Sequence, residues 1–307
     1  MHTVTVYTIR CPNPEKRGKD DQYFKLNNVK GNDLFALIVE FIDSKKNAQN
    51  DLPDEKKVYL FSNLKIENEK RTISGWIEAG SYGSKSDIVD VKKGELAFEK
   101  RANNAEIIKY YFRIVIPTDL DEGLALFHSY KGLGVKTIFY QEFSKYIQTK
   151  NIQSFQLYPT TDGKAVDQWK KATPSEIRLT DFSGEMDLAD KLKGLGHVEK
   201  KVIIKVTKAS ILSAFGTLEN YYDSETEQGR LVEVISPLCS KIQVEAKMNN
   251  RKRVFTVGIS SDDAGFTIDV DDTVEISEDV PNFDSFDKWA IELMSDLRSN
   301  IGPEESR

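Results

Sequence analysis

A run of ten residues, Ile107–Ile116 (IIKYYFRIVI), constrains the fold of this chain most strongly. It is rich in β-branched and aromatic residues, which favour a strand, and Pro117 ends it. Shorter runs of similar character predict strands over residues 3–9, 57–61 and 71–79. The first part of the chain is therefore expected to be built around a sheet.

One amphipathic helix accompanies these strands. Apolar side chains recur three and four residues apart over residues 34–45, and either Asn32 or Asp33 can cap the first turn. These elements predict an N-terminal α+β domain over residues 1–118, which is an ordinary domain size. The remaining residues, 119–307, are predicted to form a C-terminal α/β domain.

The second domain opens with GLALFHSYKGLGVKTIFYQEFSKYIQTK (residues 123–150). A buried strand, a GLG turn and a helix with Phe139 and Phe143 on one face follow one another. The fold class is thus predicted to be α+β, with two mixed α/β domains and largely antiparallel sheets. Further strands are expected at residues 152–158, 201–208, 231–235, 242–248 and 254–259, and helices around 187–192, over 211–218 and over 285–299.

The GLG turn is predicted to be a core junction and not a nucleotide site. A dinucleotide fingerprint needs a third glycine, and Thr137 stands at that position. The string GSYGSKSD (residues 80–87) places Ser84 between Gly83 and Lys85, so it does not form a phosphate loop either. No cofactor is predicted.

Composition places the chain among ordinary globular proteins. Apolar residues make up 39% and charged residues 30% of its 307 residues, enough for both a core and a solvated surface. No apolar run approaches the roughly 18 residues of a membrane span. The amino-terminal MHTVTVYTIRC alternates like a strand and unlike a signal peptide. We expect a cytoplasmic protein.

Cysteines and histidines offer little chemistry. Cys11 and Cys239 are far apart and form no CxxC pair, which fits a reducing compartment and argues against structural zinc. Of the three histidines, His128 falls on the apolar strand of the second domain, where a core or interface role is expected. No metal site is predicted.

One strand carries the residues of a possible metal-dependent nuclease. Restriction-type nucleases use (D/E)-x-K on a strand, and Glu245 and Lys247 in IQVEAK have this spacing on one face. A half-exposed strand shows the same alternation, so the two interpretations stay open. The nuclease also needs an upstream carboxylate, for which the sequence offers Asp223, Glu225 and Glu233.

Basic residues give the strongest binding signal, although the formal net charge is −6. In MNNRKRVF, two alternating strands flank Asn249-Asn250, which suits a tight turn. Arg251, Lys252 and Arg253 would then concentrate positive charge at a hairpin tip, suited to a phosphate backbone. The lysine doublets that could extend this face are Lys170-Lys171 and Lys200-Lys201.

Three segments together resemble a known family. They are the polar loop NPEKRGKDD with the helix DLFALIVEFI, the junction LALFHSYKGLGVKTIFYQEFSKYI, and FQLYP after it. Their order is similar to that of Rex-type phage-exclusion proteins and related bacterial antiphage-defence proteins, over about half of the chain. The resemblance implies a two-domain homodimer that binds DNA without strong sequence preference and works with a membrane-protein partner. It carries over no catalytic residue.

The leading hypothesis is a non-enzymatic DNA-binding or sensing component of a phage-defence system. A metal-dependent effector nuclease using Glu245 and Lys247 is the first alternative. The second is a protein–protein scaffold in which the acidic segment of residues 261–287 docks a basic partner.

Overall fold

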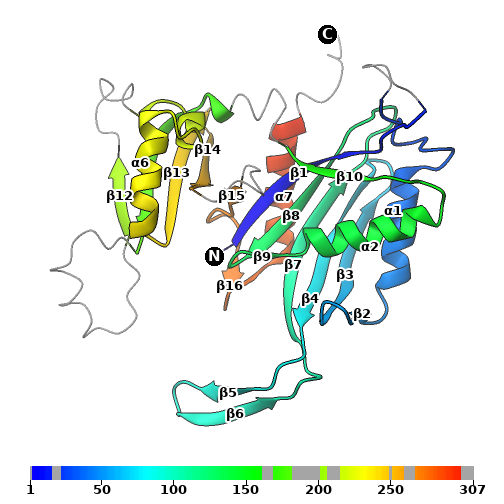
Figure 1. Ribbon diagram of the computed structural model, residues 1–307, viewed down its shortest axis with the longest axis horizontal. Helices are drawn as coiled ribbons and strands as arrows, with labels where there is room; N and C mark the ends of the chain where they lie inside the picture. The colour runs from blue at the N-terminus through cyan, green and yellow to red at the C-terminus, as the bar shows by residue number, and fades with distance from the viewer. Residues whose placement is uncertain are drawn as a thin grey trace. The chain divides into compact units, whose positions relative to one another are not determined.

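The computed structural model describes residues 2–15, 22–160, 169–181, 201–205, 215–248, 251–258 and 267–298. The chain divides into two compact units (Figure 1). The first unit comprises Tyr7–Tyr158 and Val274–Ile291, and the second comprises His2–Val6, Pro159–Thr273 and Glu292–Arg307. The boundary expected between residues 118 and 119 therefore falls inside the first unit.

The sheet of the first unit is centred on the strand that the sequence predicts most clearly. β7 (Glu106–Val115) forms an antiparallel ladder with β4 (Thr72–Ser81) along its whole length. The strand order is β1 (His2–Arg10), β8 (Gly123–Tyr130), β7, β4, β3 (Lys57–Glu67) and β2 (Asn50–Leu52), with β9 (Leu133–Gly134) beside β8 and β10 (Gln156–Pro159) beside β1.

Helices cover both faces of this sheet because the strands alternate. Phe112 points into the cluster that holds α1 (Leu34–Lys45) and α2 (Lys136–Gln148), where the rings of Phe41 and Phe143 lie 5.4 Å apart. Tyr111 points the other way and stacks on Phe286 of α7 (Phe283–Arg298) at 4.6 Å. The predicted helix at residues 34–45 is confirmed, and Asp33 is its cap.

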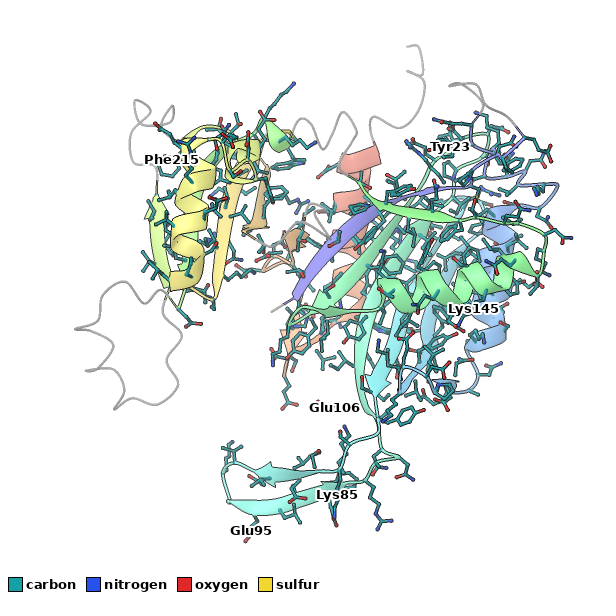
Figure 2. All side chains as sticks on the ribbon, in the orientation of Figure 1. Tyr23, Lys85, Glu95, Glu106, Lys145 and Phe215 are labelled. Atoms are coloured by element: carbon teal, nitrogen blue, oxygen red, sulfur yellow. The ribbon has the colours of Figure 1, made fainter. Side chains whose placement is uncertain are left out.

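A separate hairpin links β4 to β7. Strands β5 (Ser86–Asp90) and β6 (Glu95–Lys100) pair with each other and with no other described strand. Figure 2 shows it extending beyond the ends of β4 and β7, between the labels of Lys85, Glu95 and Glu106. The sequence analysis excluded a phosphate loop at residues 80–87 but predicted neither of these strands.

The second unit is a smaller antiparallel sheet with one covered face. Its strand order is β12 (Lys201–Lys205), β11 (Thr173–Thr180), β13 (Lys241–Met248), β14 (Arg251–Val257), β15 (Thr267–Asp269) and the start of β1. The predicted β13–β14 hairpin is confirmed by its register, which runs to Met248 opposite Arg251. The turn residues 249 and 250 lie outside the described residues.

Helix α6 (Glu227–Ile235) covers one face of this smaller sheet, with the short 3₁₀ turns η3 (Leu218–Tyr221) and η4 (Ser236–Leu238) on either side of it in the chain. Gln228 and Leu231 of α6 line a shallow apolar pocket together with Ile177 and Ile204 of the sheet. A minor hairpin of β16 (Ile276–Ser277) and β17 (Val280–Pro281) precedes α7.

One expectation for the second unit is wrong, and one of its strands was missed. Residues 231–235 belong to α6 and not to a strand, because Thr226 caps this helix through Gly229 N–H and Val232 packs inward. The central strand β11 was not foreseen, since Pro174 argues against a strand; a register shift between Pro174 and Glu176 accommodates the proline.

The remaining expectations for the fold agree with the structure or lie outside it. The α+β class with largely antiparallel pairing is confirmed. The helix expected around residues 187–192 lies outside the described residues, as do residues 211–214 of the one expected over 211–218. In the described part of the chain, no helix is long and apolar enough to cross a membrane.

Candidate nucleic-acid interface

The uncovered face of the second sheet carries the candidate site. Along β11, β13 and β14, the apolar residues Ile177, Val244 and Phe255 lie on the face that α6 covers. Their neighbours Glu176 and Glu245 lie directly opposite each other on the other face. A groove of about 660 Å³ runs over this polar face.

Two buried carboxylates form the floor of the groove. Glu245 accepts hydrogen bonds from Ser175 Oγ at 2.9 Å, Arg178 Nη2 at 2.7 Å and Lys252 Nζ at 2.7 Å. Glu176 pairs with Arg178 and, at 3.3 Å, with Lys205. Burial works to raise the pKa of Glu176, but these two cations outweigh it and lower the pKa. The Glu176 carboxylate is thus held ionised.

The charges that meet solvent on this part of the face are positive. The Glu245 side chain is 8% exposed, whereas that of Lys252 is 59% exposed. The hydrogen bond to Glu245 raises the pKa of Lys252, so the ammonium group stays charged. Lys201 and Lys205 are exposed on β12 in the same way. A ligand that approaches here meets ammonium groups first and carboxylates beneath them.

Two lysines stand directly opposite each other at one end of β13 and β14. The register pairs Lys247 with Lys252, so both side chains project from the polar face, and both are exposed. Like charges in directly opposed positions destabilise a sheet. We call Lys247 and Lys252 the lysine pair. Glu245 already balances the charge of Lys252, so a bound anion would chiefly balance that of Lys247.

The other end of the groove is acidic and internally paired. Asp269 on β15 accepts from Lys241 Nζ at 2.6 Å, from Thr256 Oγ1 at 2.9 Å and from Gln243. Asp271 pairs with Arg253. The acidic segment predicted as a docking site for a basic partner therefore uses these two carboxylates within the second unit.

The predicted basic triplet does not stay together. Of the two members whose side chains are described, Lys252 projects from the polar face, whereas Arg253 lines the acidic end of the groove beside Asp271. Arg253 is buried and pairs with Asp271 at 3.1 Å and Asp296 at 3.4 Å. Only the backbone of Arg251 is described, at the start of β14.

Among the predicted lysine doublets, only Lys201 lines the groove. Lys170 and Lys171 follow Trp169, whose ring packs against Phe255 on the covered face, and neither lines the groove. Lys200 lies outside the described residues. The sequence analysis missed Lys205 and Arg178. Each is a single cation on its strand, so neither belongs to a run of basic residues that the sequence would reveal.

The residues of the nuclease alternative share one face, as the spacing predicts. Glu245 and Lys247 both lie on the polar side of β13, and the second carboxylate there is Glu176, which the sequence analysis did not propose. The three upstream candidates lie elsewhere: Glu233 is on α6, and Asp223 and Glu225 are in the turn before it. The described residues contain no cluster of three side chains suited to a metal.

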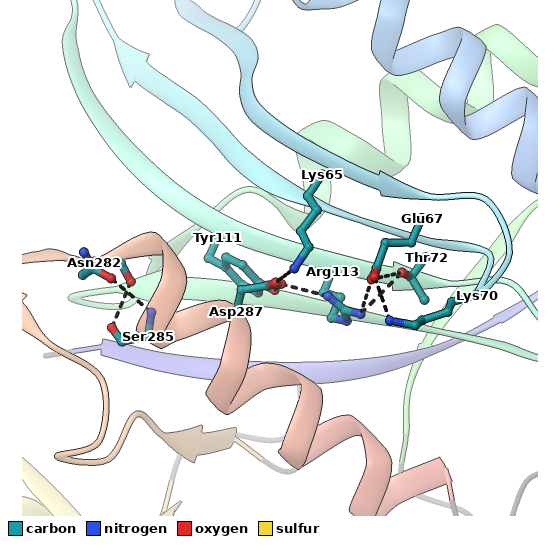
Figure 3. Close-up of polar contacts among 9 residues, drawn as sticks. All are labelled: Lys65, Glu67, Lys70, Thr72, Tyr111, Arg113, Asn282, Ser285 and Asp287. Carbon is teal, nitrogen blue, oxygen red and sulfur yellow. Dashed lines mark hydrogen bonds and ion pairs between the residues drawn. The ribbon is translucent and has the colours of Figure 1, made fainter.

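A second polar network lies buried in the first unit, beneath α7 (Figure 3). Asp287 accepts hydrogen bonds from Tyr111 Oη at 2.5 Å, Arg113 Nη1 at 2.8 Å and Lys65 Nζ at 2.9 Å. Burial by itself raises the pKa of Asp287, but these hydrogen bonds and the charge of Arg113 hold the pKa below its usual value. Burial and the Asp287 charge raise the pKa of Tyr111 well above its ordinary value. The network anchors α7 to β3 and β7.

His128 takes the core role expected from its strand. It is fully buried, its Nδ1 accepts the backbone N–H of Tyr111 at 3.3 Å, and its ring lies 5.1 Å from that of Phe286. The GLG turn likewise joins β8 to α2, as a junction between core elements.

Neither a protein-family model nor a curated protein matches this chain. The site must therefore be interpreted from its own geometry.

Proposed function

We propose that this protein binds nucleic acid without strong sequence preference, as a DNA-binding or sensing component of a phage-defence system. The lysine pair carries the biochemical part of this proposal. Two exposed lysines occupy directly opposed positions on a sheet surface whose carboxylates are buried beneath cations. Successive phosphates of a nucleic-acid backbone supply anions in the repeated arrangement that such a surface favours.

The biological part of the proposal rests on the sequence resemblance alone. It supplies the phage-exclusion role, the homodimer and the membrane-protein partner, all of which stay predictions. The phosphate-binding proposal stands without them, since it follows from the charges of the second unit.

The test is an anisotropy titration of a labelled duplex at several salt concentrations, with wild type and Lys247→Ala/Lys252→Ala. Each lost phosphate contact reduces the magnitude of the slope of log affinity against log salt by about 1. We therefore expect the slope of the double variant to be smaller in magnitude by about 2 than that of wild type. The matched control is Lys70→Ala/Lys145→Ala. These lysines are also exposed and pair with carboxylates, Glu67 at 2.8 Å and Glu142 at 2.7 Å.

Equal slopes for the lysine-pair variant and the control would overturn the proposed interface, and absence of binding at low salt would overturn the function. One further arm addresses the nuclease alternative. Glu245→Gln removes a buried negative charge beneath Lys252, so a binding surface retains or gains affinity. Metal-dependent cleavage by wild type that is lost in Glu245→Gln would establish the nuclease instead.

A further inference from the structure

The outer face of α6 is apolar where an exposed helix face is normally polar. Leu231 and Val234 lie three residues apart, on the side of the helix away from the buried Gly229 and Val232. Leu231 is 44% exposed and Val234 is 69% exposed, and Leu238 of η4, four residues further along the chain, is 39% exposed. We call Leu231, Val234 and Leu238 the α6 ridge. Apolar residues three and four apart on one helix form the ridge against which a second helix packs.

The α6 ridge leads into a pocket of about 320 Å³ between α6 and the sheet. Leu231 belongs to both, and Ile177, Ile204 and Phe215 complete the apolar part of the pocket lining. This volume lies at the lower end of the range for ligand pockets, so the pocket suits one large apolar side chain.

Tyr221 places a hydroxyl group in this apolar pocket. The residue is only 3% exposed, and no group in the described part of the chain forms a hydrogen bond with this hydroxyl. Burial raises the pKa of Tyr221 to about 12, so the hydroxyl stays protonated at neutral pH and can donate. Buried polar groups in native proteins nearly always have a partner. The hydroxyl therefore indicates that a ligand with a hydrogen-bond acceptor, such as a backbone carbonyl, binds here.

Carboxylates flank the ridge and the pocket. Residues 218–238 contain five acidic residues and one cation, and all six are exposed: Glu219, Asp223, Glu225, Glu227, Glu233 and Arg230. The cation lies 4.0 Å from Glu225. Glu227 lines the pocket, and neither Glu227 nor Glu233 forms an ion pair with any residue that the structure describes. A ligand of this surface is therefore expected to carry positive charge.

These charges distinguish between the possible occupants of the ridge. A second copy of α6 would bring the same carboxylates against each other, and an anionic lipid surface or a nucleic acid would be repelled. An apolar surface rimmed by carboxylates fits a polypeptide that offers apolar side chains beside lysine or arginine.

We propose that the α6 ridge and its pocket dock a cationic amphipathic helix of a partner protein. One large apolar side chain of that helix fills the pocket, and others cover Val234 and Leu238. Its lysines or arginines lie beside Glu227 and Glu233, and one of its carbonyl groups accepts the Tyr221 hydroxyl. The ridge lies on the side of the second sheet that α6 covers, opposite the groove, so the inference does not rest on the proposed function.

The test is an anisotropy titration with the full-length chain. The probe is a labelled peptide of about 15 residues, with leucine at helical spacing on one face and lysine on the other. Leu231→Ser/Val234→Ser should weaken binding at least about tenfold, because it removes two apolar contacts. Glu227→Gln/Glu233→Gln should weaken binding and make it less sensitive to salt. Tyr221→Phe, which removes only the hydroxyl, should weaken binding about fivefold.

The matched control is Val89→Ser/Leu96→Ser on the β5–β6 hairpin, where the two residues are 49% and 59% exposed. This control should bind the peptide like wild type, and a second peptide with glutamate in place of lysine should not bind wild type. A wild type that fails to bind the lysine peptide would overturn the proposal, and so would equal losses in the ridge variant and the control. Equal binding of the two peptides would overturn it as well. A wild-type dimer that Leu231→Ser/Val234→Ser abolishes, without any peptide binding, would assign the ridge to a second copy of this chain instead.

Discussion

Asp287 shows how much a single buried carboxylate can contribute. It pairs with Arg113, whose side chain is just as inaccessible, and the two residues are 174 positions apart in the chain. We predict that Asp287→Asn lowers the free energy of unfolding by about 3 kcal/mol, because it leaves the buried guanidinium with weaker partners. The measurement is urea unfolding at neutral pH.

Acid pH supplies a second readout of the same substitution. The pKa of Asp287 is lowered in the folded protein, so its contribution is complete above the unfolded value of about 3.9 and is lost as pH falls below it. The stability of Asp287→Asn should therefore fall less steeply than that of wild type in this acid range. Asp284→Asn, an exposed change in the same helix, should cost only about 0.5 kcal/mol.

At the scale of the element, Asp33 joins two roles at the start of α1. Its carboxylate accepts the N–H of Phe35 at 3.1 Å and pairs with both terminal nitrogens of Arg71, at 2.9 and 2.5 Å. We predict that Asp33→Ala lowers the free energy of unfolding by about 2 kcal/mol.

Asp33→Asn separates the two roles, because asparagine caps a helix nearly as well as aspartate but cannot form the ion pair. It should cost about half as much as the alanine variant in the same urea titration. Equal losses for the two variants would show that the contact with Arg71 alone stabilises this end of α1.

On the scale of the whole molecule, the proposed phosphate contacts and the homodimer that the sequence resemblance implies combine into one prediction. Such a dimer carries two lysine pairs, so a duplex that reaches both should bind with higher apparent affinity than a short one. For a duplex of about 60 base pairs, roughly 200 Å long, the affinity should exceed that expected from its larger number of sites alone by at least about tenfold.

A duplex of about 10 base pairs can reach only one lysine pair, so it gives the reference affinity for a single contact. Both affinities are measured by anisotropy at one fixed salt concentration. An affinity that rises only with the number of sites on the longer duplex would show that one lysine pair binds at a time.

The sequence by itself determined the elements whose signal is local. β7 follows from ten consecutive residues, and α1 follows from a cap and a stripe of apolar side chains at helical spacing. The face shared by Glu245 and Lys247 follows from the period of two in a strand. Each of these needs only neighbours along the chain, so sequence reasoning reaches them.

Only the tertiary structure decided what pairing across strands creates. It placed Glu176 opposite Glu245, set Lys247 against Lys252, and buried Arg253 beside carboxylates that lie tens of residues away. The register of distant strands is fixed by burial over a whole sheet, and no short window of sequence contains that information. For this reason Lys252 of the predicted basic triplet has its opposed partner, Lys247, on the neighbouring strand, whereas Arg253 is buried.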